Sequence, residues 1–591
     1  MITAILKDAV VASLRELYGQ NFSEKDFQIN QTKPEFEGDY TVVLFSLVKA
    51  LKKSPDAIGS ELGNHLLQSK NSVFVRFNII KGFLNLSVAD SYWIGNLEKN
   101  YNEICYGTKA MRGEKVMVEY SSPNTNKPLH LGHLRNNFLG WSIAAILKAA
   151  GYDIVKTCIV NDRGIHICKS MIAWKLFANG STPQSTSIKG DHFVGDYYVK
   201  FNNEYKRQVA ELVAKGIKED EAEKEAPIMK AAQQMLVDWE AGKPDVIELW
   251  KSMNSWVYAG FDETYKRIGS DFDKVYYESD TYLLGKKLVE DGLKKKVFIE
   301  KDDGSVWIDL TADGLDEKIV RRKDGTAVYI TQDIGLAVEK YEQYKCSQSI
   351  YVVGDEQNYH FKVLKLICQK LGLPSADGIY HLSYGMVELP TGKMKSREGT
   401  VVDADDLVDE MVSIAANHTQ ELGKVKDFTD EELKELYETI SLGALKFFLL
   451  RVDPKKKMIF NPEESIDFHG FTGPFVQYTH ARIRSILRKE FPAAGYKTQD
   501  TGLLPLEKEL LITLEQYGTI IEQAAFEHNP SVIATYAFNL AKTFNSFYTE
   551  HSVTNAESDE KKQLRLKLCL FTANSIQSAM ALLGVKVPER M

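Results

Sequence analysis

Apolar residues recur at helical spacing in the first part of the chain, and short apolar runs lie between these segments. Amphipathic helices are expected at 2–18 and 56–68, and strand-like runs lie at 73–80 and 83–88. The mixture of the two periodicities predicts a separate α+β module over residues 1–110.

A strand, loop, helix and strand follow from residue 114. The apolar run 115–120 precedes a long amphipathic run at 134–150, and a second strand-like run lies at 153–160. Such a unit predicts two parallel strands joined by a right-handed crossover. Further strand–helix units are expected at 327–331, 349–353 and 378–389. The pattern predicts an α/β domain with a parallel sheet over residues 111–400.

Charged helical segments dominate residues 185–320. Charge runs of this kind are usually solvated helix faces, and we expect the region to be an insertion between two halves of one sheet. Beyond residue 400 nearly all the signal is helical, with expected helices at 433–450, 478–490, 503–527, 532–549 and 561–583. We expect a connecting helical region at 401–455 and an all-α bundle at 456–591.

Composition narrows the class of protein. The chain of 591 residues is 44% hydrophobic and 26% charged, as in ordinary globular proteins. No apolar run reaches the ~18 residues of a membrane span, and charges interrupt the N-terminal helix, which does not resemble a signal peptide. We therefore expect a cytoplasmic protein without a membrane partner.

Cysteine spacing and net charge also limit the partners. The six cysteines are scattered and none has Cys-x-x-Cys spacing, so no metal site and in particular no zinc is expected. The net charge of −8 argues against binding of polyanions over the whole surface. Local basic patches for a nucleic acid remain compatible with this charge.

Two histidines lie at the predicted start of the helix after the first parallel strand. His130 and His133 share one face of the first turn, Gly132 leaves room for a flat ring, and Lys127 adds a cation. A helix N-terminus with such groups suits a triphosphate, whose charge has to be stabilised. The alternative is that two of twelve histidines lie close together by chance.

A basic segment follows a later predicted strand. Residues 392–400 contain Lys393, Lys395 and Arg397 beside Ser396. A cationic loop of this kind could close on a polyphosphate and neutralise a leaving group. The alternative is an ordinary solvated turn.

The order of these two segments, with a long insertion between them, resembles class I aminoacyl-tRNA synthetases. Their signatures have the forms His-Ile-Gly-His and Lys-Met-Ser-Lys-Ser. Here Ser396 replaces the usual second lysine, and Lys127 precedes the first signature, a combination common in arginyl-tRNA synthetases. The stretch 119–135 closely resembles that family. Further similar segments are 37–40, 82–85, 472–482 and 588–591.

The resemblance implies a Rossmann-type catalytic domain, an N-terminal domain that binds the tRNA elbow and a C-terminal anticodon-binding bundle. It implies ligation of L-arginine to tRNA(Arg) through an arginyl-adenylate, with ATP brought as its Mg²⁺ complex. AMP and pyrophosphate would be released, and the family generally needs bound tRNA for the first step. We also expect a monomer.

The same resemblance assigns site residues. The implied catalytic residues are His130, His133, Lys127, Lys393 and Lys395. The implied ATP-binding residues are His130, Gly132, His133, Gly354, Met386, Val387, Lys393 and Ser396.

An arginine substrate requires a carboxylate that meets its planar guanidinium, preferably beside an aromatic ring or hydroxyl. Tyr329 and Asp333 supply these groups at a predicted strand end, and the resemblance assigns guanidinium binding to them. The alternative for Asp333 is to cap a helix at 334–341. The remaining candidate arginine contacts are Glu119, Ser122, Asn124, His133, Glu278 and Gln357.

Two regions are candidates for tRNA contact. The resemblance assigns Phe83 and Asn85 to the elbow loop. In the bundle, an aromatic and basic surface is expected from Gln477, Tyr478, Arg482, Arg484, Arg488 and Tyr548. Phe544 and Phe547 could also stack on anticodon bases, with core packing as the alternative.

Two other functions remain open. Another class I synthetase is one, although a glutamate pocket would need cations where Asp333 stands and a cysteine enzyme usually has zinc ligands. A catalytically silent, RNA-binding paralogue is the other. The intact His130, Gly132 and His133 argue against the paralogue.

Overall fold

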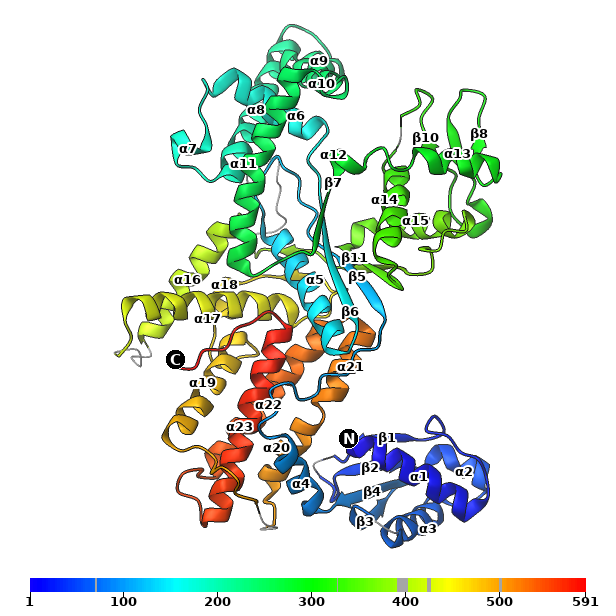
Figure 1. Ribbon diagram of the computed structural model, residues 1–591, viewed down its shortest axis with the longest axis vertical. Coiled ribbons are helices and arrows are strands. Elements are labelled where there is room, and N and C mark those ends of the chain that lie inside the picture. Colours follow the sequence, from blue (N-terminus) through cyan, green and yellow to red (C-terminus); the bar gives the residue numbers. More distant parts are fainter. Residues whose placement is uncertain (34, 70–71, 327, 391–401, 422–426, 499–501) are drawn as a thin grey trace.

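A five-stranded parallel sheet lies at the centre of the molecule (Figure 1). The computed structural model describes residues 1–591 except 34, 70–71, 327, 391–401, 422–426 and 499–501. The strands are β5 (Lys115–Glu119), β6 (Asp153–Val160), β7 (Lys274–Tyr277), β11 (Gln348–Gly354) and β12 (Ile379–Tyr384). Their order is β12-β11-β5-β6-β7, so the direction of winding reverses between β5 and β11. This reversal is the switch point of a Rossmann-type sheet, which confirms the predicted fold class.

Helix α5 (Leu131–Ala149) forms the first crossover and lies in the interior. It begins three residues before the predicted amphipathic run, and fourteen of its residues are buried. Gly140 permits close packing on the sheet, because a Cβ there would lie 2.3 Å from the Tyr120 Cβ. On its other side α5 contacts the C-terminal bundle, where the Ser142 hydroxyl donates to the Leu582 carbonyl at 2.7 Å.

The expected insertion at 185–320 is not one continuous insertion, because β7 within it pairs with β6 as a strand of the central sheet. Strand β7 has only four residues and begins with a lysine, so its sequence shows no clear strand pattern. A helical module precedes β7 and comprises mainly α6 (Ile165–Phe177), α8 (Gly190–Ala214), α10 (Pro227–Glu240) and α11 (Pro244–Ile268). A small antiparallel sheet follows it, formed by β8 (Ile299–Glu300), β9 (Val306–Ile308) and β10 (Lys318–Arg321).

The predicted strand at 327–331 is wrong. Its described residues from Tyr329 onward begin helix α14 (Tyr329–Tyr344), and residue 327 lies outside the described part. A short apolar run can belong to a strand or to a buried helix, and periodicity alone does not distinguish them. Helix α15 (Asn358–Lys370) follows β11 and packs on α14.

The N-terminal module has a four-stranded antiparallel sheet in the order β1-β2-β4-β3, and its main helices begin and end close to the predicted limits (Figure 1). The elements are α1 (Ile2–Tyr18), β1 (Gln28–Gln31), β2 (Tyr40–Val43), α2 (Phe45–Leu51), α3 (Pro55–Gln68), β3 (Phe74–Ile80), β4 (Phe83–Val88) and α4 (Asp90–Asn100). Its contact with the bundle includes an ion pair between Lys508 and Asp39 at 2.9 Å.

From Ala404 onward the described chain is mainly long helices, as predicted, interrupted by the two-residue strand β14 (Met458–Ile459) and the short helix α18 (Pro462–Ser465). The long helices are α16 (Ala404–Glu421), α17 (Asp430–Leu450), α19 (Gly473–Lys489), α20 (Pro505–Glu515), α21 (Tyr517–Glu527), α22 (Pro530–Glu550) and α23 (Asp559–Leu582). The single helix expected at 503–527 is two helices that meet at Gln516. In the described part of the chain, no helix is long and apolar enough to cross a membrane.

Candidate functional site

The two histidines cap the N-terminus of α5. The Nδ1 atom of His130 accepts from the Gly132 amide at 3.1 Å, and the Nδ1 atom of His133 accepts from the His130 amide at 3.1 Å. Each Nδ1 is therefore unprotonated, and in the neutral ring the proton lies on Nε2. Each ring therefore carries an Nε2–H donor, and neither donor has a hydrogen-bond partner among the described residues.

Burial keeps these rings neutral. Burial, with a smaller contribution from Lys127, lowers the pKa of His130 to about 3. Burial, His130 and Lys127 lower the pKa of His133 well below its usual value. Both side chains therefore offer neutral N–H donors beside a helix dipole rather than full positive charges.

Gly132 is needed for this arrangement. A Cβ at that position would lie 2.9 Å from the Cε1 of His130. The two imidazole centroids are 3.9 Å apart with an angle of 40° between the ring planes. The absence of a side chain at Gly132 therefore makes room for the imidazole ring of His130.

Two buried residues that we did not predict connect α5 to the rest of the site. The Arg135 guanidinium donates to the Gly385 carbonyl at 2.9 Å, just before the predicted ATP contacts Met386 and Val387. Asn136 accepts from the Ser121 amide at 2.6 Å and donates to the Val352 carbonyl at 2.7 Å. It therefore bridges β5 and β11 at the switch point. Sequence offers little signal for these roles, because the partners of Arg135 lie up to 323 residues away.

The candidate substrate contacts lie where the parallel strands end. Ser122 and Asn124 follow β5, Glu278 follows β7, and Gln357 follows β11. Gly354 ends β11, and Met386 comes two residues after the end of β12. A Cβ at Gly354 would lie 3.5 Å from the Met386 sulfur, so these two positions are neighbours. The carboxyl edge of such a sheet is the usual place for a ligand.

Ser122, Asn124 and Gln357 are exposed at this edge. Met386 is half-buried, whereas the Val387 side chain is 3% exposed and leaves its backbone as the group available to a base. The structure thus brings Ser122, Asn124, Gln357, Gly354 and Met386 to one edge of one sheet.

Two acidic residues lie near each other at the arginine end. Burial raises the pKa of Glu278 to about 7, Arg163 lowers it, and Asp162 and Asp333 raise it further. Helix α12 (Glu278–Thr281) packs on α14, which carries Asp333, so the two carboxylates belong to neighbouring helices.

Asp333 has a partner that the sequence did not predict. The Nε2 atom of His360 lies 2.6 Å from the Asp333 carboxylate. Asp333 stands in the second turn of α14, so the alternative of a helix cap is wrong. Asp333 belongs to α14 and His360 to α15. The only sequence signal for the pair is that His360 closely follows the segment 354–358, which contains the predicted contact Gln357.

One predicted arginine contact needs correction. Glu119 is 8% exposed and pairs with Lys340 of α14, which is 1% exposed. Its charge is already compensated, so it joins α14 to the sheet instead of adding free negative charge to the pocket. Tyr329 opens α14 one turn before Asp333, with 74% of its surface exposed, and its assignment to the guanidinium stays a prediction.

The predicted basic loop lies outside the described residues. Lys393, Lys395, Ser396 and Arg397 all belong to the segment 391–401. The chain directly after it is held against the histidine motif. The Leu131 amide donates to the Val402 carbonyl at 3.1 Å, and the Ala404 amide donates to the Leu129 carbonyl at 3.0 Å. Residues 402–404, which follow the basic segment in sequence, therefore lie at the N-terminus of α5.

Models of known families match nearly the whole chain. Residues 98–461 match the catalytic domain of the class I tRNA synthetases, type R. Residues 476–591 match the DALR anticodon binding domain, and residues 4–88 match the arginyl tRNA synthetase N-terminal domain. The chain belongs to the arginyl-tRNA synthetase family.

Full-length relatives agree with this assignment. The arginine–tRNA ligase of Flavobacterium psychrophilum is 51% identical over 603 residues, with 99% of each chain covered. That of Parabacteroides distasonis is 52% identical over 592 residues, with 99% of this chain and 98% of the relative covered.

Solved structures support the fold. The arginyl-tRNA synthetase of Thermus thermophilus gives a TM-score of 0.80 at 24% identity, with 100% of both chains covered. The enzyme of Plasmodium falciparum gives 0.76 at 18% identity, with 100% of this chain and 99% of that one covered.

The candidate RNA contacts of the N-terminal domain differ in exposure. Phe83 is 37% exposed and meets Phe45 edge to face, with ring centroids 5.5 Å apart. Asn85 is 1% exposed, accepts from the Thr41 hydroxyl at 2.5 Å and donates to Asn78 at 2.8 Å. The prediction that the Asn85 side chain contacts tRNA is therefore wrong for this structure, because sheet hydrogen bonds occupy it.

In the bundle, Arg482 lies between the rings of Tyr478 and Tyr548, 4.9 and 5.9 Å from their centroids. Tyr548 is 38% exposed, and Arg482 and Tyr548 line a cavity of about 420 Å³. This part of the predicted aromatic and basic surface is brought together.

Three other bundle residues have internal partners. Gln477 is 0% exposed and donates to the carbonyls of Thr439 and Lys586 at 3.0 and 2.7 Å, which rules out direct RNA contact here. Arg484 pairs with Glu589 at 3.1 Å, and Arg488 donates to the Glu589 carbonyl at 2.7 Å. Phe544 and Phe547 are both 0% exposed, so core packing is the correct alternative for them.

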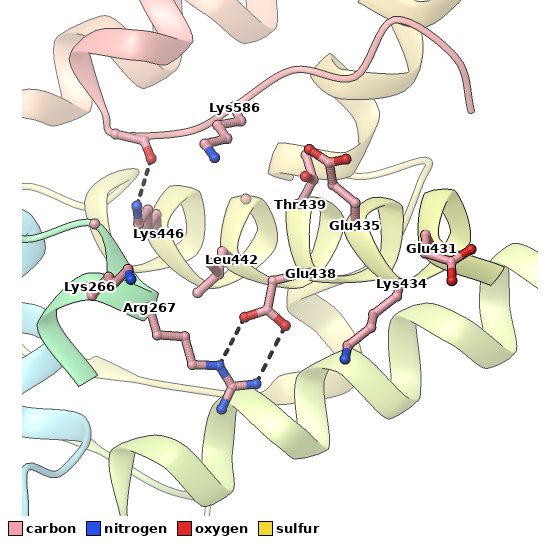
Figure 2. Close-up of a pocket in the computed structure, with 13 residues that line it drawn as sticks. Lys266, Arg267, Glu431, Lys434, Glu435, Glu438, Thr439, Leu442, Lys446 and Lys586 are labelled. Atoms are coloured by element: carbon pink, nitrogen blue, oxygen red, sulfur yellow. Dashed lines mark hydrogen bonds and ion pairs between the residues drawn. The ribbon is translucent and has the colours of Figure 1, made fainter. Parts of the chain in front are cut away.

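A larger cavity of about 650 Å³ lies between α11, α17 and the C-terminal segment (Figure 2). Arg267 binds Glu438 in it with two hydrogen bonds of 2.9 and 3.4 Å. Lys446 donates to the Gly584 carbonyl at 2.7 Å, and burial, helped by Lys586, lowers its pKa to about 8. No predicted site residue lines this cavity among the described residues, and its lining groups serve mainly to join the catalytic domain to the C-terminal segment.

Proposed function

We propose that this chain ligates L-arginine to tRNA(Arg) in two steps driven by ATP. The observation that carries the proposal is the pair of neutral Nε2–H donors at the N-terminus of α5, at the switch point of the sheet. Two acidic side chains support the proposal: Glu278 directly follows β7, and Asp333 lies on α14, which packs on the helix that Glu278 begins. Joining arginine to a nucleotide requires both a phosphate site and a cation site.

In the first step the arginine carboxylate attacks the α-phosphorus of ATP and pyrophosphate leaves. The residues act by positioning and by stabilising charge, and no protein nucleophile is needed. His130 and His133 donate to phosphate oxygens as the charge shifts toward the leaving group. Lys127, with Lys393 and Lys395 of the basic segment, stabilises the pyrophosphate, and Mg²⁺ arrives with ATP as part of the substrate.

In the second step a hydroxyl of the terminal ribose of tRNA attacks the arginyl carbonyl carbon. The bond to phosphate breaks, AMP leaves, and arginine remains esterified to the tRNA. Gly132, Met386 and Val387 hold the adenine end, while Ser122, Asn124 and Gln357 hold the amino-acid end.

Specificity for arginine comes from the carboxylates. Asp333 accepts the guanidinium fork, and Glu278 supplies further negative charge above pH about 7. A neutral analogue would leave these acidic groups unpaired, so a single site discriminates strongly without editing.

Exchange of labelled pyrophosphate into ATP tests the proposal directly. We expect exchange when arginine and tRNA(Arg) are both present. Citrulline, which has the same shape without the charge, is the matched control and should support at least about a hundredfold less exchange at equal concentration. Exchange driven by glutamate or cysteine instead would support another class I synthetase, and no exchange with any amino acid would support the silent paralogue.

The tRNA is proposed to lie across both flanking domains. Phe83 of the N-terminal domain and the group formed by Tyr478, Arg482 and Tyr548 of the bundle are the described residues best placed for it. The monomeric state and the cytoplasmic location stay predictions.

A further inference from the structure

A cluster of charged side chains beside the histidine motif has no role in the mechanism above. The cluster consists of Lys189, Asp191 and His192 at the start of α8 and Asp403 and Asp405 at the start of α16. It borders a cavity that is also lined by residues of the histidine motif. That cavity measures about 230 Å³, and its lining includes Lys127, His130, His192, Asp196 and Asp403.

Asp403 connects the cluster to the catalytic motif. It pairs with His130 as an isolated antiparallel bridge, supported by the backbone hydrogen bonds on both sides of it. One carboxylate oxygen of Asp403 accepts from the Asp405 and Asp406 amides at 2.8 and 3.3 Å and so caps α16. The other oxygen lies 3.3 Å from the Nε2 atom of His192.

His192 is held between two carboxylates. Its Nε2 atom is also 3.3 Å from Asp405, which accepts in addition from Lys189 at 2.7 Å and from Thr264 of α11 at 3.1 Å. The charged groups that face His192 are thus Lys189 and Asp191 on the α8 side and Asp403 and Asp405 on the α16 side. Lys127, His130 and Asp196 line the same cavity.

Lys189 makes a metal ion unnecessary here. The ligand atoms of Asp191, His192 and Asp405 lie within 4.8 Å of one another, as in a metal site. The Lys189 ammonium lies 3.1 Å from Asp191 and 2.7 Å from Asp405, where a cation would be needed. Lys189 therefore compensates part of the negative charge that would otherwise attract a metal ion.

The backbone around the cluster is closely fitted. A Cβ at Gly260 of α11 would lie 2.3 Å from a carboxylate oxygen of Asp191, which is 0% exposed. A Cβ at Gly195 of α8 would lie 2.9 Å from Pro128, next to Lys127. Helix α8 therefore packs directly on the segment that leads into the histidine motif.

We propose that His192 is a positioning residue for the nucleotide site, which acts through Asp403 on His130. This inference rests on the proposed function. His192 attracts the Asp403 carboxylate from the α8 side as an ion pair at 3.3 Å, and the Asp403 backbone in turn pairs with His130. Without His192, two acidic side chains would face each other beside the motif and the bridge would shift.

His192→Ala is the first test, measured by ATP–pyrophosphate exchange with arginine and tRNA(Arg) present. We expect kcat/KM for ATP to fall about tenfold, because small displacements of catalytic groups are costly. The arginine KM should stay within about twofold. His418→Ala is the matched control, since His418 of α16, like His192 of α8, is a partly exposed histidine that pairs with an acid, here Glu463 at 3.8 Å.

His192→Gln separates positioning from folding, because its amide donates to Asp403 but does not titrate. We expect it to recover most of the activity at neutral pH. Hydrogen bonding to Asp405 is the main cause that raises the pKa of His192 to about 8, so its ion pairs are present below that pH and lost above it. Wild-type kcat/KM for ATP should therefore fall between about pH 7 and about pH 9, and the fall should be smaller in His192→Gln.

Wild-type kcat/KM for ATP in His192→Ala would overturn the proposal. A glutamine variant no better than alanine, or one with the full alkaline fall of the wild type, would also overturn it. Asp403→Asn keeps the cap on α16 and tests the same link from its other end. We expect it to lower kcat/KM for ATP about as much as His192→Ala does. The double variant, His192→Ala with Asp403→Asn, should show no further loss. Failure of the proposed function is distinguishable, because wild-type protein would then show no exchange at any pH.

Discussion

Asp333 is the position at which the arginine pocket can be tested most sharply. Asp333→Asn removes the charge and keeps the shape, whereas Asp333→Ala also removes the partner of His360. A hydrogen bond to a charged group contributes about 1.5 to 3 kcal/mol. The Asp333 side chain is 39% exposed, so solvent screens its pair with the guanidinium. We therefore expect a loss in the lower part of this range, about 1.5 to 2 kcal/mol, which is about a 12- to 30-fold rise in the arginine KM.

The assay is ATP–pyrophosphate exchange at varied arginine, with ATP and tRNA(Arg) saturating. The ATP KM should change by less than about threefold, because Asp333 lies at the amino-acid end of the site. Glu342→Ala, an exposed carboxylate on the same helix, is the control for nonspecific charge effects. A wild-type arginine KM in both Asp333 variants would refute the assignment. An equal rise in the ATP KM would show instead that the substitution disturbs the whole edge of the sheet.

Four other substitutions test separate parts of the structure. Because Glu278 ionises at about pH 7, the arginine KM should fall as pH rises from about 6 to about 8, and Glu278→Gln should flatten that profile. Lys127→Ala should lower the rate of adenylation about tenfold in single-turnover measurements, and a wild-type rate would contradict the idea that Lys127 compensates for Ser396. Lys340→Met leaves Glu119 buried and unpaired, and should lower the free energy of unfolding by about 3 to 5 kcal/mol in a denaturant melt. Gln477→Leu should lower it by about 2 kcal/mol through two unpaired carbonyls, with an unchanged KM for tRNA; a raised tRNA KM in folded protein would restore a role in RNA contact.

The elements that sequence predicted best are those with local signals. The strand expected at 153–160 is β6 with the same limits, and the helix expected at 2–18 is α1. The short strand β7 was missed because four residues carry too little periodicity. The strand expected at 327–331 failed because tertiary packing decides whether a short apolar run is helical.

The candidate site divides in the same way. The position of His130 at the start of α5 depends on local sequence, and the sequence predicted it correctly. The pairs Glu119 with Lys340 and Asp333 with His360 join residues 221 and 27 positions apart, and no local pattern reveals them. For the same reason Gln477 looked like part of a polar surface, although its partners in the fold enclose it.

The partners of Arg135 determine when, during synthesis of the chain, the nucleotide site can reach its final structure. Its described hydrogen-bond partners all come from Gly385 or later, and they include the carbonyls of Leu449, Pro454 and Lys456. A growing chain that ends before these residues contains the whole histidine motif, yet it leaves a guanidinium in the interior with unsatisfied donors. The first half of the nucleotide site therefore cannot reach its final packing until some 300 further residues have been made, a long-range closure that slows folding. The motif appears early in the sequence, but the site that it serves matures late.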